Sequence, residues 1–153
     1  MSIFIKICGI TNVEDANLSV EYGADAIGLN QYKQSPRYIN EKALSKIKES
    51  LDSNVLIVPV FVNPSEDEVF KFLSVFPDCF LQFHGNESPE FCKKFERPFI
   101  KSMTIDNSIS TYNYQKEYAS AKYFLLDSGT EDLHRGTGEK FDWKRIPQDG
   151  NNL

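Results

Sequence analysis

Two reactive side chains in this sequence each follow a short apolar run. Cys8 ends the first such run and precedes Gly9, and Asp127 ends the run that begins near residue 122. A deprotonated thiol acts as a base or a nucleophile, and a carboxyl group gives or takes protons, so both residues can take part in proton transfer. Two plainer interpretations stay open. Cys8 could be a small buried hydrophobic residue, and Asp127 could be a turn or cap residue before Ser128.

Three further polar residues stand where they could assist such chemistry. Arg37 follows Ser35-Pro36, where its guanidinium could bind a carboxylate through two hydrogen bonds or could be a solvated loop charge. Gln82 and His84 close another apolar run. His84 could help to bind a ligand, or it could be a structural residue whose hydrogen bonds are satisfied within the fold. These residues can form one functional site only if the fold brings them together.

The pattern of the sequence predicts such a fold. Short apolar runs alternate with segments that carry helix signals, which is typical of parallel strands joined by crossover helices. Expected strands lie near residues 3–8, 25–30, 55–61, 80–84, 99–104 and 122–127. Expected helices lie near residues 13–22, 41–51, 66–75 and 89–95. Because the carboxyl ends of parallel strands meet at one edge in a closed barrel, the candidate residues are expected to face one cavity.

Local signals set several boundaries. Helix starts are predicted by the capping-box spacing of Thr11 with Glu14 and of Ser65 with Glu68, and by Ser88 before Pro89. Residues 107–121 have weak helix propensity and no strand pattern, so their structure is left open. Pro59 lies inside the most apolar strand, where it removes a hydrogen-bond donor from the ladder. A local irregularity is expected there.

Composition narrows the class of protein. The 153 residues, 41% hydrophobic and 25% charged, suit a single globular domain over residues 1–153. The net charge of -5 and the scattered lysines and arginines argue against a nucleic-acid partner. No run approaches the roughly 18 apolar residues of a membrane span, and a cytoplasmic location is expected. Three unpaired cysteines suit reduced thiols, and the two histidines do not make a zinc site with them.

Several motifs in this order carry a resemblance to a known family. They are Lys6-Ile7-Cys8-Gly9-Ile10-Thr11, Ser35-Pro36-Arg37, Gln82-Phe83-His84-Gly85, Leu125-Leu126-Asp127-Ser128, and Gly136-Thr137-Gly138 before Phe141-Asp142-Trp143. Alone, Gly136-Thr137-Gly138 is a weak signal, because pairs of glycines are common in loops. Together, the motifs resemble phosphoribosylanthranilate isomerase, an enzyme of tryptophan biosynthesis.

The resemblance implies a reaction and roles for these residues. The reaction is an Amadori rearrangement that converts N-(5-phosphoribosyl)anthranilate, a phosphorylated aminosugar, to 1-(2-carboxyphenylamino)-1-deoxyribulose 5-phosphate. Asp127 would be the general acid that opens the furanose ring, and Cys8 the general base that removes the neighbouring proton. The substrate-binding residues would be Arg37, Gln82, His84, Gly136, Thr137 and Gly138. The resemblance implies neither a metal nor an organic cofactor.

The resemblance also implies a parallel (β/α) barrel of the TIM type, of which this sequence holds about six of eight units. Eight units of about 25 residues need about 200 residues, so the barrel is expected to be incomplete. A doubly wound open sheet is the competing fold, but no G-x-G-x-x-G turn follows the first strand. The loops that usually bind phosphate, after strands 7 and 8, are expected to be missing.

An open arc leaves two unpaired strand edges. The 153-residue chain is therefore expected to be weakly active or inactive by itself, with a homo-oligomer or a second chain as one way to close the arc. Two other functions stay open. One is a different sugar-phosphate barrel enzyme, and the other is a non-catalytic remnant or assembly module that uses the exposed edges.

Overall fold

The computed structural model describes residues 3–51, 55–104 and 111–127. In these residues strands and helices alternate in the order β1 (Lys6–Cys8), α1 (Val13–Glu21), β2 (Ala26–Asn30), α2 (Glu41–Ser50), β3 (Leu56–Phe61), α3 (Glu66–Val75), β4 (Leu81–Phe83), α4 (Pro89–Lys93), β5 (Phe99–Thr104), α5 (Thr111–Glu117) and β6 (Tyr123–Asp127). The expected alternation is confirmed. Most boundaries agree with the sequence-based ranges to within two residues, but β1 begins only at Lys6.

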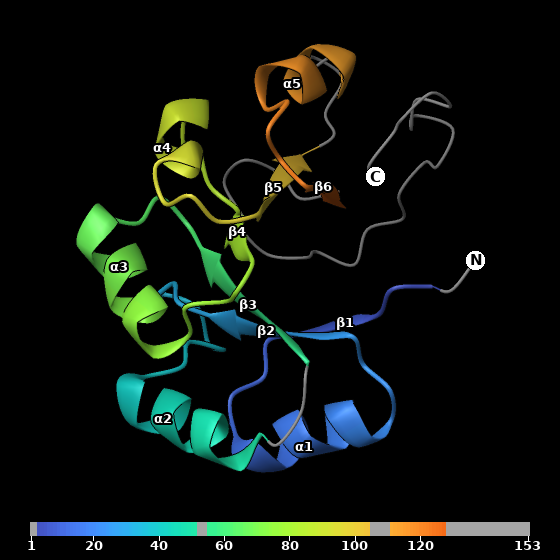
Figure 1. The fold of residues 1–153 in the computed structure, drawn as a ribbon, viewed down its shortest axis with the longest axis vertical. Coiled ribbons are helices and arrows are strands. Elements are labelled where there is room, and N and C mark those ends of the chain that lie inside the picture. Colours follow the sequence, from blue (N-terminus) through green and yellow to red (C-terminus); the bar gives the residue numbers. More distant parts are fainter. Residues whose placement is uncertain (1–2, 52–54, 105–110, 128–153) are drawn as a thin grey trace.

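All six strands are parallel and pair in chain order, from β1 to β6. The sheet is curved, with the helices on its outer side (Figure 1). Its two end strands approach each other at their amino ends, where the rings of Phe4 and Tyr123 stack with centroids 6.4 Å apart. Within the described ranges β1 and β6 each pair with one strand only. The fold is therefore an incomplete parallel α/β barrel, as the sequence predicted.

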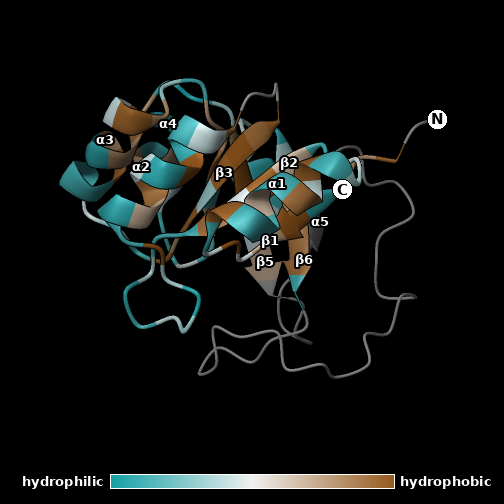
Figure 2. Ribbon diagram, turned by 90° about the horizontal axis from the view of Figure 1, so that it is seen from below, coloured by the Kyte–Doolittle hydropathy of each residue, from teal (hydrophilic) through white to brown (hydrophobic). Residues whose placement is uncertain are grey.

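The two faces of the sheet have different cores because successive side chains of a strand point to opposite faces. On the outer face, Ile27, Leu81 and Phe83 are fully buried with apolar residues of the helices, such as Leu44 of α2. Figure 2 shows hydrophobic residues along the strands and hydrophilic residues over much of the helices. A smaller cluster on the inner face includes Ala26, Val58 and Ile100, with Leu56 and Phe80 packed against it. Polar side chains occupy the inner face beyond this cluster, toward the carboxyl ends of the strands.

The predicted N-cap residues are correct in two of three helices. Ser65 forms the full capping box with Glu68, and the side chain of Ser88 accepts a hydrogen bond from the backbone of Phe91. The N-cap predicted for the first helix was wrong by one residue, although the helix begins at Val13 as expected. Asn12, not Thr11, caps α1, because its side chain accepts from the Asp15 backbone N–H at 2.8 Å. Asparagine is at least as good an N-cap as threonine, so either residue could have served.

The region that the sequence left open contains α5, a helix of seven residues. Its weak intrinsic propensity is offset by packing. The buried Tyr118, which follows the helix, stacks on Tyr114 with centroids 4.7 Å apart. Tyr114 also contacts the ring of Phe124 on β6 edge-on. Tertiary contacts of these aromatic rings therefore hold a segment whose sequence alone favours no structure.

Pro59 does not interrupt β3. The strand continues to Phe61, and its register with β2 includes the pair Leu29–Pro59. The N–H that the proline lacks would point toward β4. The register with β4 begins one residue later, at Val60. On either side of the proline, the Ile57 carbonyl accepts from the Phe80 N–H and the Phe61 carbonyl from the His84 N–H, and these two donors flank β4. The expected irregularity is thus a shortened ladder between β3 and β4.

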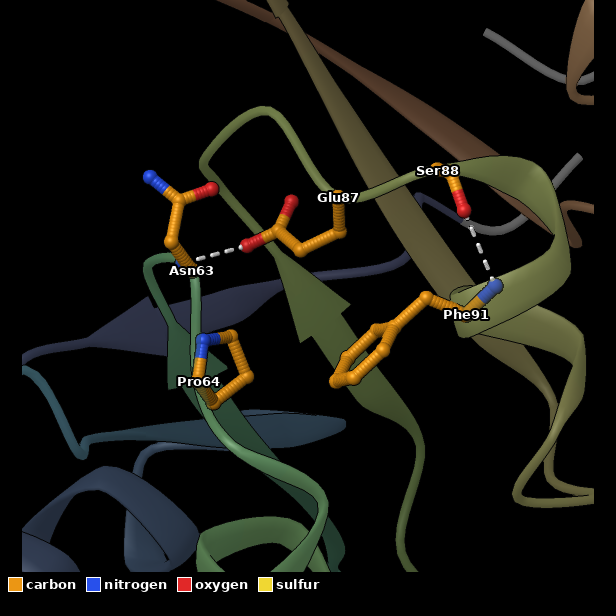
Figure 3. A pocket seen from close by; sticks show the side chains of 5 residues that line it. All are labelled: Asn63, Pro64, Glu87, Ser88 and Phe91. Carbon is orange, nitrogen blue, oxygen red and sulfur yellow. Dashed lines mark hydrogen bonds between the residues drawn. The ribbon is translucent and has the colours of Figure 1, made fainter.

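A buried ion pair fixes the loops after β3 and β4. Lys101 of β5 points to the outer face, and its ammonium contacts the Glu87 carboxylate at 2.9 Å with both side chains almost fully buried. Glu87 also accepts from the backbone N–H groups of Asn63 and Gly85, and Lys101 donates to the Gly85 carbonyl. Figure 3 shows the Glu87 carboxylate directed at the backbone of Asn63. One buried pair thereby joins three segments of the chain.

Replacement of Lys101 by methionine should strongly destabilise the protein. The substitution leaves the Glu87 charge buried without its cation, which typically costs about 3–5 kcal/mol of the free energy of unfolding. Urea denaturation followed by circular dichroism measures this loss. Lys71→Met is the matched control, because Lys71 pairs with Glu41 on the surface. Equal stability of the two variants would contradict a structural role for the buried pair.

Candidate active site

Cys8 lies on the inner face at the carboxyl end of β1, and it is exposed. Its neighbour in register on β2 is Gly28. A Cβ atom at position 28 would lie 2.8 Å from the Cys8 sulfur, which is closer than any real contact of this kind. The absence of a side chain at Gly28 therefore gives the thiol its place on the inner face.

The turn after Cys8 brings Arg37 beside it. Gly9 has a φ of 86°, a conformation that favours glycine, and its N–H donates to the Gly28 carbonyl at 2.9 Å. A Cβ atom on Gly9 would lie 2.6 Å from the Arg37 side chain. Arg37 Nη1 lies 3.5 Å from the carbonyl oxygen of Cys8. The glycine is thus required both by the turn and by the close approach of the guanidinium.

The loop after β2 holds Arg37 through Ser35 and Asn30. The Ser35 hydroxyl accepts from the Arg37 backbone N–H at 3.2 Å and from the Asn30 side-chain amide at 3.1 Å. Tyr38 forms a parallel bridge with Asn30, which returns the chain to the end of β2. These local bonds explain why a charged loop residue reaches the end of β1.

The second group of candidate residues meets on the inner face of β4, β5 and β6. The Nε2 atom of His84 lies 3.2 Å from Oδ2 of Asp127. On the other side of the imidazole ring, Nδ1 lies 2.7 Å from the Ser102 hydroxyl and 3.2 Å from Nε2 of Gln82. The structure thus brings Gln82, His84 and Asp127 together, as the sequence suggested, at the same end of the sheet as Cys8.

The environment of His84 favours the neutral form of its ring. Burial lowers the pKa of His84 from its usual 6.5, and the nearby Asp127 carboxylate opposes this shift only in part. Lys101 lowers the pKa further, whereas Glu87 raises it slightly. A neutral imidazole carries one N–H, so the proton of His84 sits on only one of its two nitrogens at neutral pH.

Two polar residues of this site were not singled out from the sequence. Ser102 is buried on β5 and contacts His84, and Lys6 of β1 donates from its ammonium to Oε1 of Gln82 at 2.7 Å. The two-residue spacing of Lys6 and Cys8 places both on the same face of a strand, and this signal could have found Lys6. Ser102 had no comparable signal, because a lone serine near a strand end is common.

The remaining predicted residues, Gly136, Thr137 and Gly138, lie outside the described residues. Among the residues that the structure describes, no group of three or more histidine, cysteine, aspartate or glutamate side chains could hold a metal ion. In the same residues no helix is both long and apolar enough to cross a membrane.

Alkylation of the folded protein should modify Cys8 alone. Cys79 and Cys92 are buried, and burial raises the pKa of each thiol to about 12, so neither is accessible or ionised near pH 8. Iodoacetamide at pH 8 should therefore add one carbamidomethyl group, which peptide mass spectrometry assigns to residue 8. Protein unfolded in urea is the control and should gain three groups. Rapid labelling of Cys79 or Cys92 in the folded protein would contradict this placement of the thiols.

Substitution of Gly28 by alanine should destabilise the protein by crowding the Cys8 thiol. Overpacking of this kind costs about 1–3 kcal/mol of the free energy of unfolding. The cost should be smaller when the sulfur is removed by Cys8→Ala, because the tightest contact is with that atom. Urea denaturation of the four proteins of this double-mutant cycle measures the coupling. Equal costs in both backgrounds would show that the sulfur is not the group that needs the space.

Comparison with known proteins agrees with this geometry. The family model of N-(5'-phosphoribosyl)anthranilate (PRA) isomerase matches residues 5–152. The N-(5'-phosphoribosyl)anthranilate isomerase of Nitrosomonas europaea is 42% identical over 147 residues, which cover 96% of this chain and 70% of the relative.

Two solved structures have the same fold. The phosphoribosyl anthranilate isomerase of Thermotoga maritima has a TM-score of 0.83 and 36% identity, over 95% of this chain and 70% of that one. A second phosphoribosyl anthranilate isomerase, in complex with reduced 1-(o-carboxyphenylamino)-1-deoxyribulose 5-phosphate, has a TM-score of 0.68 and 31% identity, over 84% and 77% of the two chains. The chain belongs to the N-(5'-phosphoribosyl)anthranilate isomerase family.

Proposed function

We propose that this chain carries the acid and the base of an N-(5'-phosphoribosyl)anthranilate isomerase of tryptophan biosynthesis. The observation that carries the proposal is the placement of Cys8 and Asp127. They lie on the two end strands of the arc, at the same end of the sheet and on its inner face. A relative of known structure binds a reduced form of the aminoketose phosphate, which fits a small phosphorylated substrate.

The proposed reaction needs one proton donor and one proton acceptor. Asp127 in its protonated form gives a proton to the furanose ring oxygen, the bond from that oxygen to C1 breaks, and the nitrogen lone pair forms a Schiff base with C1. The Cys8 thiolate then removes the proton from C2, and the electrons of that C–H bond form an enolamine. Tautomerisation of the enolamine yields the ketone. No oxidant or reductant enters, because the hydrogen lost from C2 is balanced by the one gained at C1.

The neighbours of the two groups suit these roles. His84 contacts the Asp127 carboxylate from the side, so an N–H at its Nε2 would stabilise the negative charge left when the acid gives up its proton. Arg37 lies beside the carbonyl of Cys8, where its guanidinium can bind the carboxylate of the anthranilate group. The inner face near Cys8 therefore provides a cation that can bind the carboxylate on the aromatic ring of the substrate.

The proposal has three further parts. A cytoplasmic location fits a small-molecule biosynthetic enzyme. A single domain over residues 1–153 fits the continuous six-stranded sheet of the described part. Closure of the arc by a second chain fits the one-sided pairing of β1 and β6 there. Each stays a prediction, as do the binding roles of Gly136, Thr137 and Gly138.

Loss of either proton-transfer group should abolish most of the isomerase activity. Cys8→Ala and Asp127→Asn should each lower kcat by about 10²–10⁴-fold, the usual contribution of a general acid or base. Initial rates with N-(5'-phosphoribosyl)anthranilate measure this loss, and Lys71→Met is the control for an exposed substitution. Arg37→Met should mainly raise KM, since it removes a binding cation.

Two results would overturn the proposal. Full turnover by either Cys8→Ala or Asp127→Asn would remove that residue from the mechanism. Failure of the unaltered protein to isomerise this substrate, together with turnover of a sugar phosphate that lacks the aromatic carboxylate, would favour a different sugar-phosphate isomerase.

A further inference from the structure

Lys6 occupies an unusual position for a lysine. It lies on the inner face of β1, in register with Ala26 and two residues before Cys8. Its side chain is half-buried and reaches across the inner face to β4, where its ammonium donates to Oε1 of Gln82 at 2.7 Å. A solvated lysine of an end strand would point its charge away from the sheet. The ammonium of Lys6 instead donates to the neutral amide of Gln82, a residue that is 2% exposed.

The contact fixes the orientation of the Gln82 amide. An ammonium group has only donors, so the amide must present its oxygen to Lys6 and its NH₂ group to the other side. On that side Nε2 of Gln82 lies 3.2 Å from Nδ1 of His84 and 3.5 Å from the Ser102 hydroxyl. The amide therefore offers a donor to His84 directly. It also offers one to Ser102, whose hydroxyl can pass a donor on to Nδ1 at 2.7 Å.

The orientation of the amide in turn fixes the proton of the imidazole. Because a donor faces Nδ1, that nitrogen must accept and carries no hydrogen when the ring is neutral. The single N–H then sits on Nε2, 3.2 Å from the carboxylate oxygen Oδ2 of Asp127. The opposite tautomer would set two donors against each other at Nδ1. At Nε2 it would set a lone pair against a carboxylate oxygen.

We propose that Lys6 is a positioning residue that acts through Gln82 to hold His84 in the Nε2–H tautomer, the form that donates to Asp127. This inference rests on the proposed function, in which Asp127 is the general acid. When the acid releases its proton, the carboxylate gains a negative charge that a preoriented N–H stabilises. A neutral donor also avoids a full positive charge beside a carboxyl group that must be reprotonated in each cycle.

The tautomer can be read directly by NMR. A His134→Gln background leaves His84 as the single histidine of the chain. In this protein labelled with ¹⁵N-histidine, long-range ¹H–¹⁵N correlation at pH 7.5 should show a protonated Nε2 and an unprotonated Nδ1. Lys6→Met should shift the ring toward the Nδ1–H form, because the amide is then free to turn its oxygen to His84. Lys6→Arg keeps a donor-only group and should retain the Nε2–H form.

Two further variants sharpen the test. Gln82→Glu replaces the donor at Nδ1 by a carboxylate oxygen of the same shape, so it should place a proton on Nδ1 while Lys6 is intact. Lys71→Met is the matched loss of a surface lysine and should leave the spectrum unchanged. In activity assays, Lys6→Met should lower kcat by about 10- to 100-fold with little change in KM, somewhat less than direct removal of an electrostatic donor costs.

The outcomes separate this inference from the proposed function. An Nδ1–H tautomer in the unaltered protein, or an unchanged tautomer in Lys6→Met, overturns the role of Lys6 even if the isomerase activity is present. The expected tautomers support it even if a different substrate is turned over. If Lys6→Met does not fold, the spectrum of the unaltered protein can still overturn the inference, because an Nδ1–H tautomer there is incompatible with it.

Discussion

The period of two along a strand is the constraint on which this structure depends. Each strand of the curved sheet presents alternate residues to the helix layer and to the inner face. In β5 the alternation sends Ile100 and Ser102 inward and Lys101 outward, into three different environments. A shift of the register by one residue would exchange these faces and bring Lys101 to the inner face in place of Ser102. The polar site and the apolar layer under the helices are therefore two results of the same register.

Curvature brings distant strands within reach of one another. In a flat sheet of six strands, β1 and β4 would lie about 14 Å apart, at the usual spacing of about 4.8 Å between neighbours. Here the lysine of β1 reaches the glutamine of β4 at 2.7 Å, and Phe4 stacks on Tyr123 at the amino ends of the first and last strands. Contacts across the hollow of the sheet thus depend on its bend as well as on its order.

The sequence predicted the elements well because the signals for them are local. Apolar runs gave all six strands, and cap residues gave the start of α3. It predicted Thr11 as the first cap where the structure has Asn12, since two adjacent residues with similar capping ability differ only in how the turn presents them. The state of residues 111–117 depended on aromatic packing with residues that follow in the chain, which local propensity does not contain.

The candidate site likewise contains residues that local signals in the sequence identify and residues that they do not. Cys8, His84 and Asp127 could be found as reactive types at strand ends, and the chain order of parallel strands predicted their common edge. The roles of Ser102 and Gly28 could not be found in this way. One depends on a hydroxyl that lies 2.7 Å from a ring nitrogen, and the other on an absent side chain beside a sulfur atom. Such dependence on distances within a folded sheet leaves little trace in a single sequence.

Two lysines hold the short segment of chain around His84, which directly follows β4, and they act from opposite faces of the sheet. Lys6 binds the side chain of Gln82 on the inner face, while Lys101 binds the carbonyl of Gly85 and the Glu87 carboxylate on the outer face. His84 lies between these two anchors. Glu87 adds a bond to the Gly85 N–H, so the backbone on the C-terminal side of the histidine has little freedom to rotate. An imidazole that must present one particular nitrogen to a carboxyl group needs both its backbone position and its proton fixed, and each lysine supplies one of these two conditions.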